Sequence, residues 1–321
     1  MTIIVGDTHF HNDNDINREY LKFFNKYIIS NSEYKNIILL GDIFNSKKML
    51  NIKSINFVLD NIFDKLTDRN IYIVMGNHDY YNRVEDKESI NSLRLLDRLY
   101  KNIKVIYKDN IIKIGDKDVY AIPYGFQPDS SKIDRCDYII GHIELSPQYS
   151  NSPYTLDTFK NKPIYLGHYH LKTYRGIPYV GTPYHMNFND IDEKKGFHIL
   201  NDDYTLTFIE NSVTRRYLSM IKENNKITIE NRCMDYKDFL KNIDNYKHHI
   251  YYLYNRDSDE EFITLLDSHG FNYIVKTVEV SEMEIVMDMD DEDIFDIIEH
   301  ILDRDFDREL LKEAKKELNS Q

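Results

Sequence analysis

Five short apolar runs in this 321-residue chain each end at a glycine that is followed at once by polar side chains. The runs are rich in β-branched and aromatic residues, and apolar and polar positions do not alternate within them. This pattern is typical of strands that are covered on both faces. The five runs occupy residues 1–5, 36–40, 71–75, 137–140 and 164–166.

Helical patterns separate several of these runs. Apolar side chains recur at helical spacing over residues 16–30 and again over residues 52–66. Alternating strands and helices predict a layered α/β fold. Functional residues in such folds collect at the carboxyl ends of the strands. All five glycine-led polar clusters are predicted to lie there.

The polar clusters contain seven side chains of types that bind metal ions. They are Asp7, His9, Asp42, Asn77, His142, His168 and His170. Mixed oxygen and nitrogen donors suit Mn, Fe or Zn better than Ca or Mg alone. Seven donors are too many for one tetrahedral ion and suit two ions that share a bridging carboxylate. A single Gly-Asp or Gly-His pair is ordinary loop chemistry, so the prediction rests on recurrence at five consecutive strand ends.

The cysteine spacing and the apolar runs indicate the cellular compartment and whether a membrane is a partner. Two cysteines, Cys136 and Cys233, stand far apart without metal-binding spacing, so we expect reduced thiols. The first residues do not form a signal peptide, and no run of about 18 apolar residues predicts a membrane span. We therefore expect a cytoplasmic protein with no membrane partner.

The net charge of −13 argues at first against a nucleic-acid partner. The acidity is uneven, however. Residues 279–321 hold 16 acidic and 5 basic side chains, whereas the preceding residues hold 38 acidic and 36 basic ones. The nearly neutral front part of the chain therefore leaves a DNA partner open.

The character of the chain changes near residue 212. A small α+β unit is predicted beyond it, with two strands and a helix over residues 248–254, 271–280 and 258–269. An acidic run over residues 287–293 follows. Two amphipathic helices are then predicted, at about residues 291–302 and 305–318.

The motifs, taken in order, resemble those of the calcineurin-like metallophosphoesterase superfamily: D-x-H, G-D, G-N-H-D, G-H and G-H-x-H. GDIF at 41–44, GNHD at 76–79 and YVGTPYHMNFND at 179–190, followed by KKGFHIL, are similar to the SbcD nuclease family. IGHIEL at 140–145 and VGTP look most like the phage members, the nuclease subunit of a phage recombination endonuclease. The resemblance is strong over residues 1–212 and implies a two-sheet α/β sandwich nuclease core there.

The resemblance also implies a role for each donor. Two Mn²⁺ ions are expected, with Mg²⁺, Fe²⁺ or Zn²⁺ as other possible metals. One ion would be held by Asp7, His9, Asp42 and His170, and the other by Asp42, Asn77, His142 and His168. Asp42 would then bridge the two ions.

Two neighbours of Asn77 are left outside this ligand set. His78 is the candidate for protonating the leaving oxygen, or for stabilising the transition state as an imidazolium. Asp79 would orient His78 or a ligand, and a plain turn cap is the alternative. The first SbcD motif usually continues into Leu-Gly, whereas Phe10 and His11 follow here. His11 is a candidate phosphate contact, and a surface histidine is the alternative.

Residues 213–282 would form a DNA-capping domain. His185 would line the cleft, and four basic side chains are candidates for phosphate contacts: Arg215, Arg216, Lys222 and Lys226. A solvated basic face is the alternative. Residues 283–321 would form an acidic linker and helices that dock on an SbcC-type coiled-coil ATPase, unless these helices pack on the chain's own core.

The resemblance implies a Mn²⁺-dependent 3′–5′ double-strand exonuclease and single-strand endonuclease that processes DNA ends in recombination and repair. It also implies a homodimer, in the host cytoplasm if the chain is phage-encoded. Two alternatives stay open. One is a dinuclear-metal phosphodiesterase or phosphatase acting on small nucleotides or phosphoproteins, and the other is a non-catalytic scaffold for the ATPase.

Overall fold

The computed structural model describes residues 1–47, 49–81, 91–145, 154–174, 177–255 and 260–277. The chain divides into two units, Met1–Thr277 and Val278–Gln321. The predicted acidic linker and both predicted C-terminal helices lie outside the described residues. No helix within the described ranges is both long and apolar enough to cross a membrane.

Six strands form the first sheet, in the order β12-β11-β1-β2-β3-β4. Strands β1 to β4 are parallel, and β11 and β12 complete the sheet in antiparallel pairs. The strands are β1 (Thr2–Val5), β2 (Asn36–Leu39), β3 (Asn70–Val74), β4 (Ile103–Ile106), β11 (Gly196–Leu200) and β12 (Leu206–Glu210).

Four strands form the second sheet, in the order β5-β6-β7-β8. Strands β6, β7 and β8 are parallel, and β5 pairs with β6 in the antiparallel sense. The strands are β5 (Asn110–Ile114), β6 (Lys117–Ile122), β7 (Tyr138–His142) and β8 (Ile164–Gly167). Two short strands, β9 (Thr173–Tyr174) and β10 (Ile177–Pro178), pair separately.

The two sheets pack face to face. Successive side chains of a strand point to opposite faces, so Ile3 and Val5 join a core beneath the helices, whereas Ile4 joins the core between the sheets. Ile140 reaches that central core from the second sheet. Burial on both faces explains why the apolar runs do not alternate and confirms the predicted two-sheet α/β sandwich.

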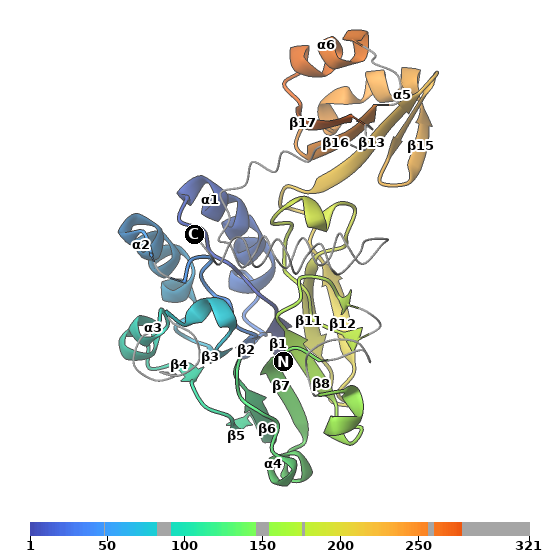
Figure 1. Cartoon of the computed structure of the whole chain (residues 1–321). Helices are drawn as coiled ribbons and strands as arrows, with labels where there is room; N and C mark the ends of the chain where they lie inside the picture. Colours follow the sequence, from blue (N-terminus) through green and yellow to red (C-terminus); the bar gives the residue numbers. More distant parts are fainter. Residues whose placement is uncertain (48, 82–90, 146–153, 175–176, 256–259, 278–321) are drawn as a thin grey trace, which may run out of the picture. The chain divides into compact units, whose positions relative to one another are not determined.

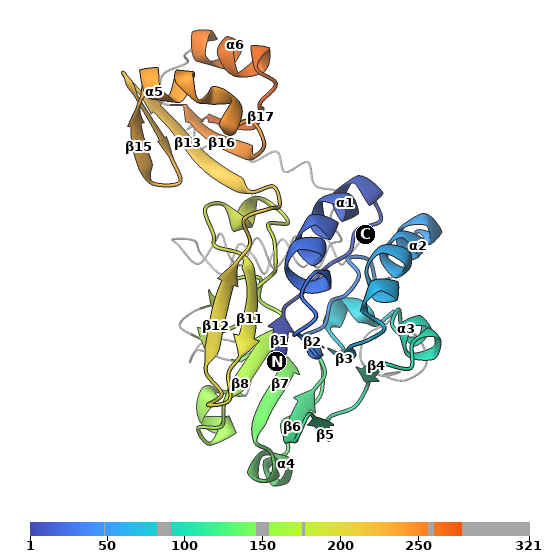
Figure 2. The same cartoon turned by 180° about the vertical axis from the view of Figure 1, so that it is seen from behind.

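Helices cover the outer faces of both sheets. The first sheet is covered by α1 (Asn14–Phe23), α2 (Ile52–Asn61) and α3 (Arg94–Leu99), which lie together in Figures 1 and 2. A π-helical turn, Phe24–Ile29, extends α1, and a 3₁₀ turn, Phe63–Leu66, follows α2. The second sheet carries α4 (Ser130–Arg135) and a 3₁₀ turn, Leu156–Phe159.

Local chemistry sets where the first two helices begin. The side chain of Asp13 accepts a hydrogen bond from the Asp15 N–H, and Asn51 accepts one from the Lys53 N–H. Such caps satisfy N–H groups that have no partner inside the helix. The helical patterns predicted over residues 16–30 and 52–66 correspond to α1 and α2 with their following turns.

A third sheet follows, in the order β15-β14-β13-β16-β17. Its elements are β13 (Tyr217–Glu223), β14 (Lys226–Ile229), β15 (Arg232–Asp235), α5 (Tyr236–Lys241), β16 (Ile250–Asn255), α6 (Glu260–Ser268) and β17 (Asn272–Thr277). A separate apolar core lies around Phe239, Tyr251 and Leu266. Within the described residues, the two strands and the helix predicted from the sequence correspond to β16, β17 and α6. Residues 258–259 of the predicted helix and 278–280 of the second predicted strand lie outside the described residues.

One expectation about the strand order was wrong. The five glycine-terminated strands are not consecutive, because β4, β5 and β6 lie between β3 and β7 along the chain. The five also belong to two sheets: β1, β2 and β3 to the first, and β7 and β8 to the second.

Candidate metal centre

The seven predicted donors lie at the carboxyl ends of five strands, three from the first sheet and two from the second. The carboxyl ends of these five strands meet at one site. The site therefore depends on the packing of the two sheets against each other as well as on each strand.

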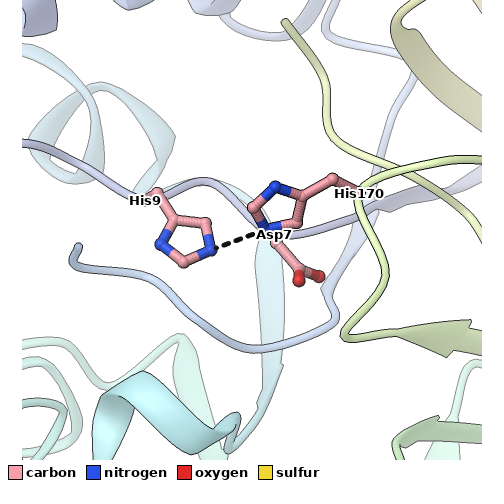
Figure 3. A group of neighbouring side chains, drawn as sticks. All are labelled: Asp7, His9 and His170. Carbon is pink, nitrogen blue, oxygen red and sulfur yellow. Dashed lines mark hydrogen bonds between the residues drawn. The ribbon is translucent and has the colours of Figure 1, made fainter. Parts of the chain in front are cut away.

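One cluster of donors combines the β1 loop with the β8 loop. Ligand atoms of Asp7, His9 and His170 all lie within 4.8 Å of one another. Figure 3 shows these three side chains converging, and the dashed line joins His9 Nε2 to His170 Nε2, 3.2 Å apart. Two imidazole nitrogens at this distance either share a proton or face a common cation.

A second cluster of donors shares Asp7 with the first. Asp7, Asp42 and His142 also offer ligand atoms within 4.8 Å of one another. Asn77 Oδ1 lies 2.9 Å from His142 Nε2 and 3.1 Å from His168 Nδ1.

The Asp42 carboxylate lies close to one donor of each proposed ion. Its Oδ2 atom is 3.6 Å from His9 Nε2 and 3.5 Å from His142 Nε2. His9 and His142 were assigned to different ions by resemblance, so this is the position that a bridging carboxylate would occupy.

The backbone is strained at three of the donors. His9, Asp42 and His168 have φ values of 41°, 48° and 98°, in the left-handed region that residues with a Cβ rarely adopt. Such conformations persist only where the surrounding structure enforces them, and they cluster at functional sites.

Gly41 allows the β2 loop to approach the site. Its φ is +93°, and a Cβ at this position would lie 2.5 Å from His142 Nδ1 and 2.7 Å from the Gly76 nitrogen. Any side chain here would displace either His142 or the β3 loop. The glycine before Asp42 is therefore required by close packing at the site.

Three carboxylates are buried together. Asp7, Asp42 and Asp79 are each at most 2% exposed. Burial, together with the Asp42 charge, raises the pKa of Asp7 well above its usual range and the pKa of Asp79 to about 8. Burial also acts to raise the pKa of Asp42, but the imidazoles of His142, His78 and His9 outweigh it and lower that pKa.

The four donor imidazoles favour the neutral form. Burial lowers the pKa of His168 to about 3 and that of His170 to about 4. Burial likewise lowers the pKa of His9 and of His142. His142 Nδ1 lies 2.6 Å from the Leu40 carbonyl, which can only accept. Nδ1 therefore carries the proton, and the lone pair is on Nε2, the nitrogen that faces Asn77 and Asp42.

This donor set fits divalent cations. Buried carboxylates repel one another, and nearby positive charge relieves that repulsion. Neutral imidazoles with one nitrogen bonded to a carbonyl are typical metal ligands. The four imidazoles, two carboxylates and one amide oxygen suit transition-metal ions such as Mn²⁺, Fe²⁺ or Zn²⁺.

Comparison with known families decides the identity of the core. Residues 2–192, more than half of the chain, match the model of the calcineurin-like phosphoesterases. The chain belongs to this family. A search of curated proteins found no match to this phosphoesterase.

His78 of the phosphoesterase is held beside the donors by two hydrogen bonds. Its backbone N–H donates to Asp42 Oδ1 at 2.8 Å, and its ring Nδ1 lies 2.8 Å from the Asn45 carbonyl. The carbonyl assigns the proton to Nδ1, so Nε2 is the nitrogen that can exchange a proton. The ring packs edge-on against His9, with centroids 4.9 Å apart.

Asp79 joins the β2 loop to the β3 loop. Its carboxylate accepts backbone N–H groups from Asp42 at 2.9 Å, Ile43 at 3.0 Å and Gly76 at 2.8 Å. The Gly76 bond caps its own 3₁₀ turn, Asn77–Asp79. The other two bonds fix the backbone that carries Asp42, so both the turn-cap and the ligand-orienting interpretations describe part of its geometry.

Replacing Asp79 with asparagine should destabilise the phosphoesterase. The asparagine N–H₂ group cannot accept hydrogen bonds from the backbone N–H groups that the carboxylate oxygen accepted. At least one buried hydrogen bond is then lost, which lowers the free energy of unfolding by about 1–3 kcal/mol. We expect a lower melting temperature and weaker Mn²⁺ binding. Thermal unfolding and calorimetry check this, with Asp137→Asn as control, since Asp137 also accepts a backbone N–H, from Asp118 at 2.7 Å. Unchanged Mn²⁺ affinity in the Asp79 variant would mean that it does not orient Asp42.

Two residues predicted to contact DNA, His185 and Arg216, are poorly available to a phosphate. His185 is 5% exposed, and its Nδ1 accepts the Tyr217 N–H at 3.3 Å, so its burial argues against the predicted DNA contact. Arg216 donates through both terminal guanidinium nitrogens, Nη1 and Nη2, to the Glu230 carboxylate. This pairing neutralises the charge that a phosphate would need.

The other basic candidates stand nearer to solvent. Arg215 is exposed, and its backbone N–H donates to Glu19. Lys226 is exposed at the start of β14, and the Lys222 ammonium lies 5.4 Å from the centre of the Tyr236 ring. His11 is half-buried, and its Nδ1 accepts the Asp13 N–H at 3.0 Å within its own loop.

Tyr124 lies beside the donors and was not predicted from the sequence. Its ring centre lies 5.7 Å from that of His168 and 6.2 Å from that of His142. Tyr124 follows β6, a strand that was not predicted. The apolar run that ends in Pro-Tyr-Gly at residues 123–125 was the available signal.

Proposed function

We propose that this phosphoesterase is a Mn²⁺-dependent DNA nuclease of the SbcD type, a 3′–5′ double-strand exonuclease and single-strand endonuclease. The observation that carries the proposal is the convergence of seven neutral or anionic donors from two sheets, with His78 bonded beside them. A scaffold without catalysis has no need for strained, buried and mutually repelling donors. That argues for an enzyme.

The chain's own residues divide the work. Asp7, His9, Asp42 and His170 would hold one cation, and Asp42, Asn77, His142 and His168 the other. Cations in this position supply Lewis acidity and positive charge against the phosphoryl oxygens. His78 would hold a proton on Nε2 and give it to the leaving oxygen, while its Nδ1–H keeps donating to the Asn45 carbonyl oxygen.

Two features favour DNA over a small phosphoester. Residues 179–190 carry the segment that resembles SbcD, and they lead directly to Asp192. Asp192 is bonded to β13, because its N–H donates to Tyr217 O at 3.1 Å and its Oδ1 accepts the Ser219 N–H at 2.9 Å. The proposed capping domain, residues 213–282, thus begins beside the core.

A digest of three substrates tests the proposal. The purified protein is incubated with Mn²⁺ and end-labelled duplex DNA, circular single-stranded DNA or bis-p-nitrophenyl phosphate. We expect all three to be cleaved and a chelator to abolish each cleavage. Cleavage of bis-p-nitrophenyl phosphate alone would favour a small-substrate phosphodiesterase, and cleavage of none would favour the scaffold.

The proposal includes an ATPase partner that docks on the C-terminal segment. Deleting residues 290–321 should release an SbcC-type ATPase in a pull-down and leave Mn²⁺-dependent cleavage of bis-p-nitrophenyl phosphate intact, because no proposed donor lies in this segment. Retention of the ATPase by the truncated protein would assign docking to another surface.

The proposal also includes a homodimer. Large apolar side chains are exposed on α2 and α3, among them Ile52 at 74% and Leu99 at 56%. Exposed apolar side chains on neighbouring helices are suited to contact with a second copy. Light scattering after size-exclusion chromatography measures the mass, and a monomer at micromolar concentration would count against this part of the proposal.

A further inference from the structure

A buried ion pair lies directly behind the candidate metal centre. Asp190 Oδ1 and Lys195 Nζ are in contact, and their side chains are 2% and 3% exposed. Asp190 ends the segment GTPYHMNFND, and Lys195 lies in the segment KKGFHIL that follows. Neither residue is among the seven proposed donors.

The lysine connects this pair to a proposed ligand. Lys195 Nζ donates to the carbonyl oxygen of His170 at 2.8 Å, and the Thr182 N–H donates to the same oxygen at 3.1 Å. The His170 peptide is therefore fixed from two directions, and its ring nitrogen lies 3.2 Å from that of His9.

The aspartate holds the other side of the pair. Asp190 Oδ2 accepts the Met186 N–H at 2.7 Å and the Asn187 N–H at 3.3 Å. One carboxylate thus closes the 3₁₀ turn Phe188–Asp190 and orients the ammonium toward His170.

Stability alone does not account for such a pair. Taking both charges out of water costs several kcal/mol each, and well-packed apolar residues of similar volume are often as stabilising. A charged donor aimed at the backbone of a metal ligand has a further effect, because it limits how that ligand can move.

We propose that the Asp190–Lys195 pair is a positioning element of the metal centre. The Lys195 ammonium fixes the His170 backbone and thereby keeps the His170 imidazole facing His9 and Asp7. This role rests on the proposed metal-dependent function, and neither residue is assigned as a ligand.

Two variants separate positioning from folding. Lys195→Met leaves Asp190 buried without its partner, which lowers stability. The double variant Asp190→Asn with Lys195→Met removes both charges and keeps an acceptor for the Met186 N–H, so its melting temperature should recover. Both variants lose the bond to His170.

Lys132 provides the matched control. Its Nζ also bonds to a carboxylate and to a backbone carbonyl, Asp109 Oδ2 and Asp109 O, the latter at 3.0 Å. Asp109 directly precedes β5, and Lys132 lies in α4, the helix on the outer face of the second sheet. Lys132→Met should therefore alter stability and leave Mn²⁺ affinity unchanged.

Mn²⁺ binding to the metal-stripped, full-length protein is measured by calorimetry. We expect both Lys195 variants to bind about 10-fold more weakly than the wild type and Lys132→Met to bind like the wild type. A folded double variant with wild-type affinity would overturn the positioning role, and so would an equal loss in the control. A wild type that binds no Mn²⁺ would overturn the proposed centre itself, whereas a wild type that binds Mn²⁺ but leaves DNA intact would overturn only the nuclease proposal.

Discussion

Replacing Asp42 with asparagine should lower Mn²⁺-dependent cleavage of bis-p-nitrophenyl phosphate by about 10³-fold or more, or ~4 kcal/mol in the barrier. Asp42 Oδ2 lies 3.6 Å from His9 Nε2 and 3.5 Å from His142 Nε2, one donor from each proposed ion. A neutral amide keeps the shape but removes the charge that both cations would share. Calorimetry should show weaker Mn²⁺ binding at both positions.

Asp137→Asn is again the control, because Asp137 is a half-buried carboxylate in a backbone hydrogen bond at the start of β7. It should retain wild-type activity and Mn²⁺ stoichiometry. Full activity in the Asp42 variant, or loss of one ion with the other bound at wild-type affinity, would contradict the bridging assignment.

Replacing His78 with alanine should lower cleavage by about 10²–10⁴-fold through loss of the proton donor. The Mn²⁺ content should stay near that of the wild type. The His78 backbone N–H would still donate to Asp42 Oδ1, because the substitution alters only the side chain. Kinetics and metal analysis on the same sample separate the two effects.

His269→Ala, at the end of α6, controls for the removal of an imidazole. It should change neither activity nor metal content. If His78→Ala loses both ions, His78 supports the site structurally and is not the residue that transfers the proton.

The sheet strands that lead to the site were predictable because they carry a strong local signal. Strands buried on both faces, such as β2, read as continuous apolar runs. Strand β5 has a weaker signal, because it begins at exposed Asn110 and is interrupted by exposed Lys113. The division of the donors between two sheets was not predictable either, since it depends on how the two sheets pack in the central core that includes Ile4, Ile38 and Ile140.

The donor types were readable from the sequence, but their surroundings were not. The left-handed backbone at His168 and the three N–H groups on Asp79 arise only when distant loops meet. The same holds for Arg216, which is charged in the sequence and neutralised by Glu230 in the fold. A basic residue in the sequence therefore does not show whether its charge stays unpaired in the fold.

We predict that seven donors from five strand ends form one centre for two cations. A crystal of the wild-type protein soaked in Mn²⁺ and measured for anomalous scattering tests this directly. We predict two Mn²⁺ peaks, both in contact with Asp42, with His78 beside them and bound to neither. A single peak, or peaks away from these strand ends, would contradict it.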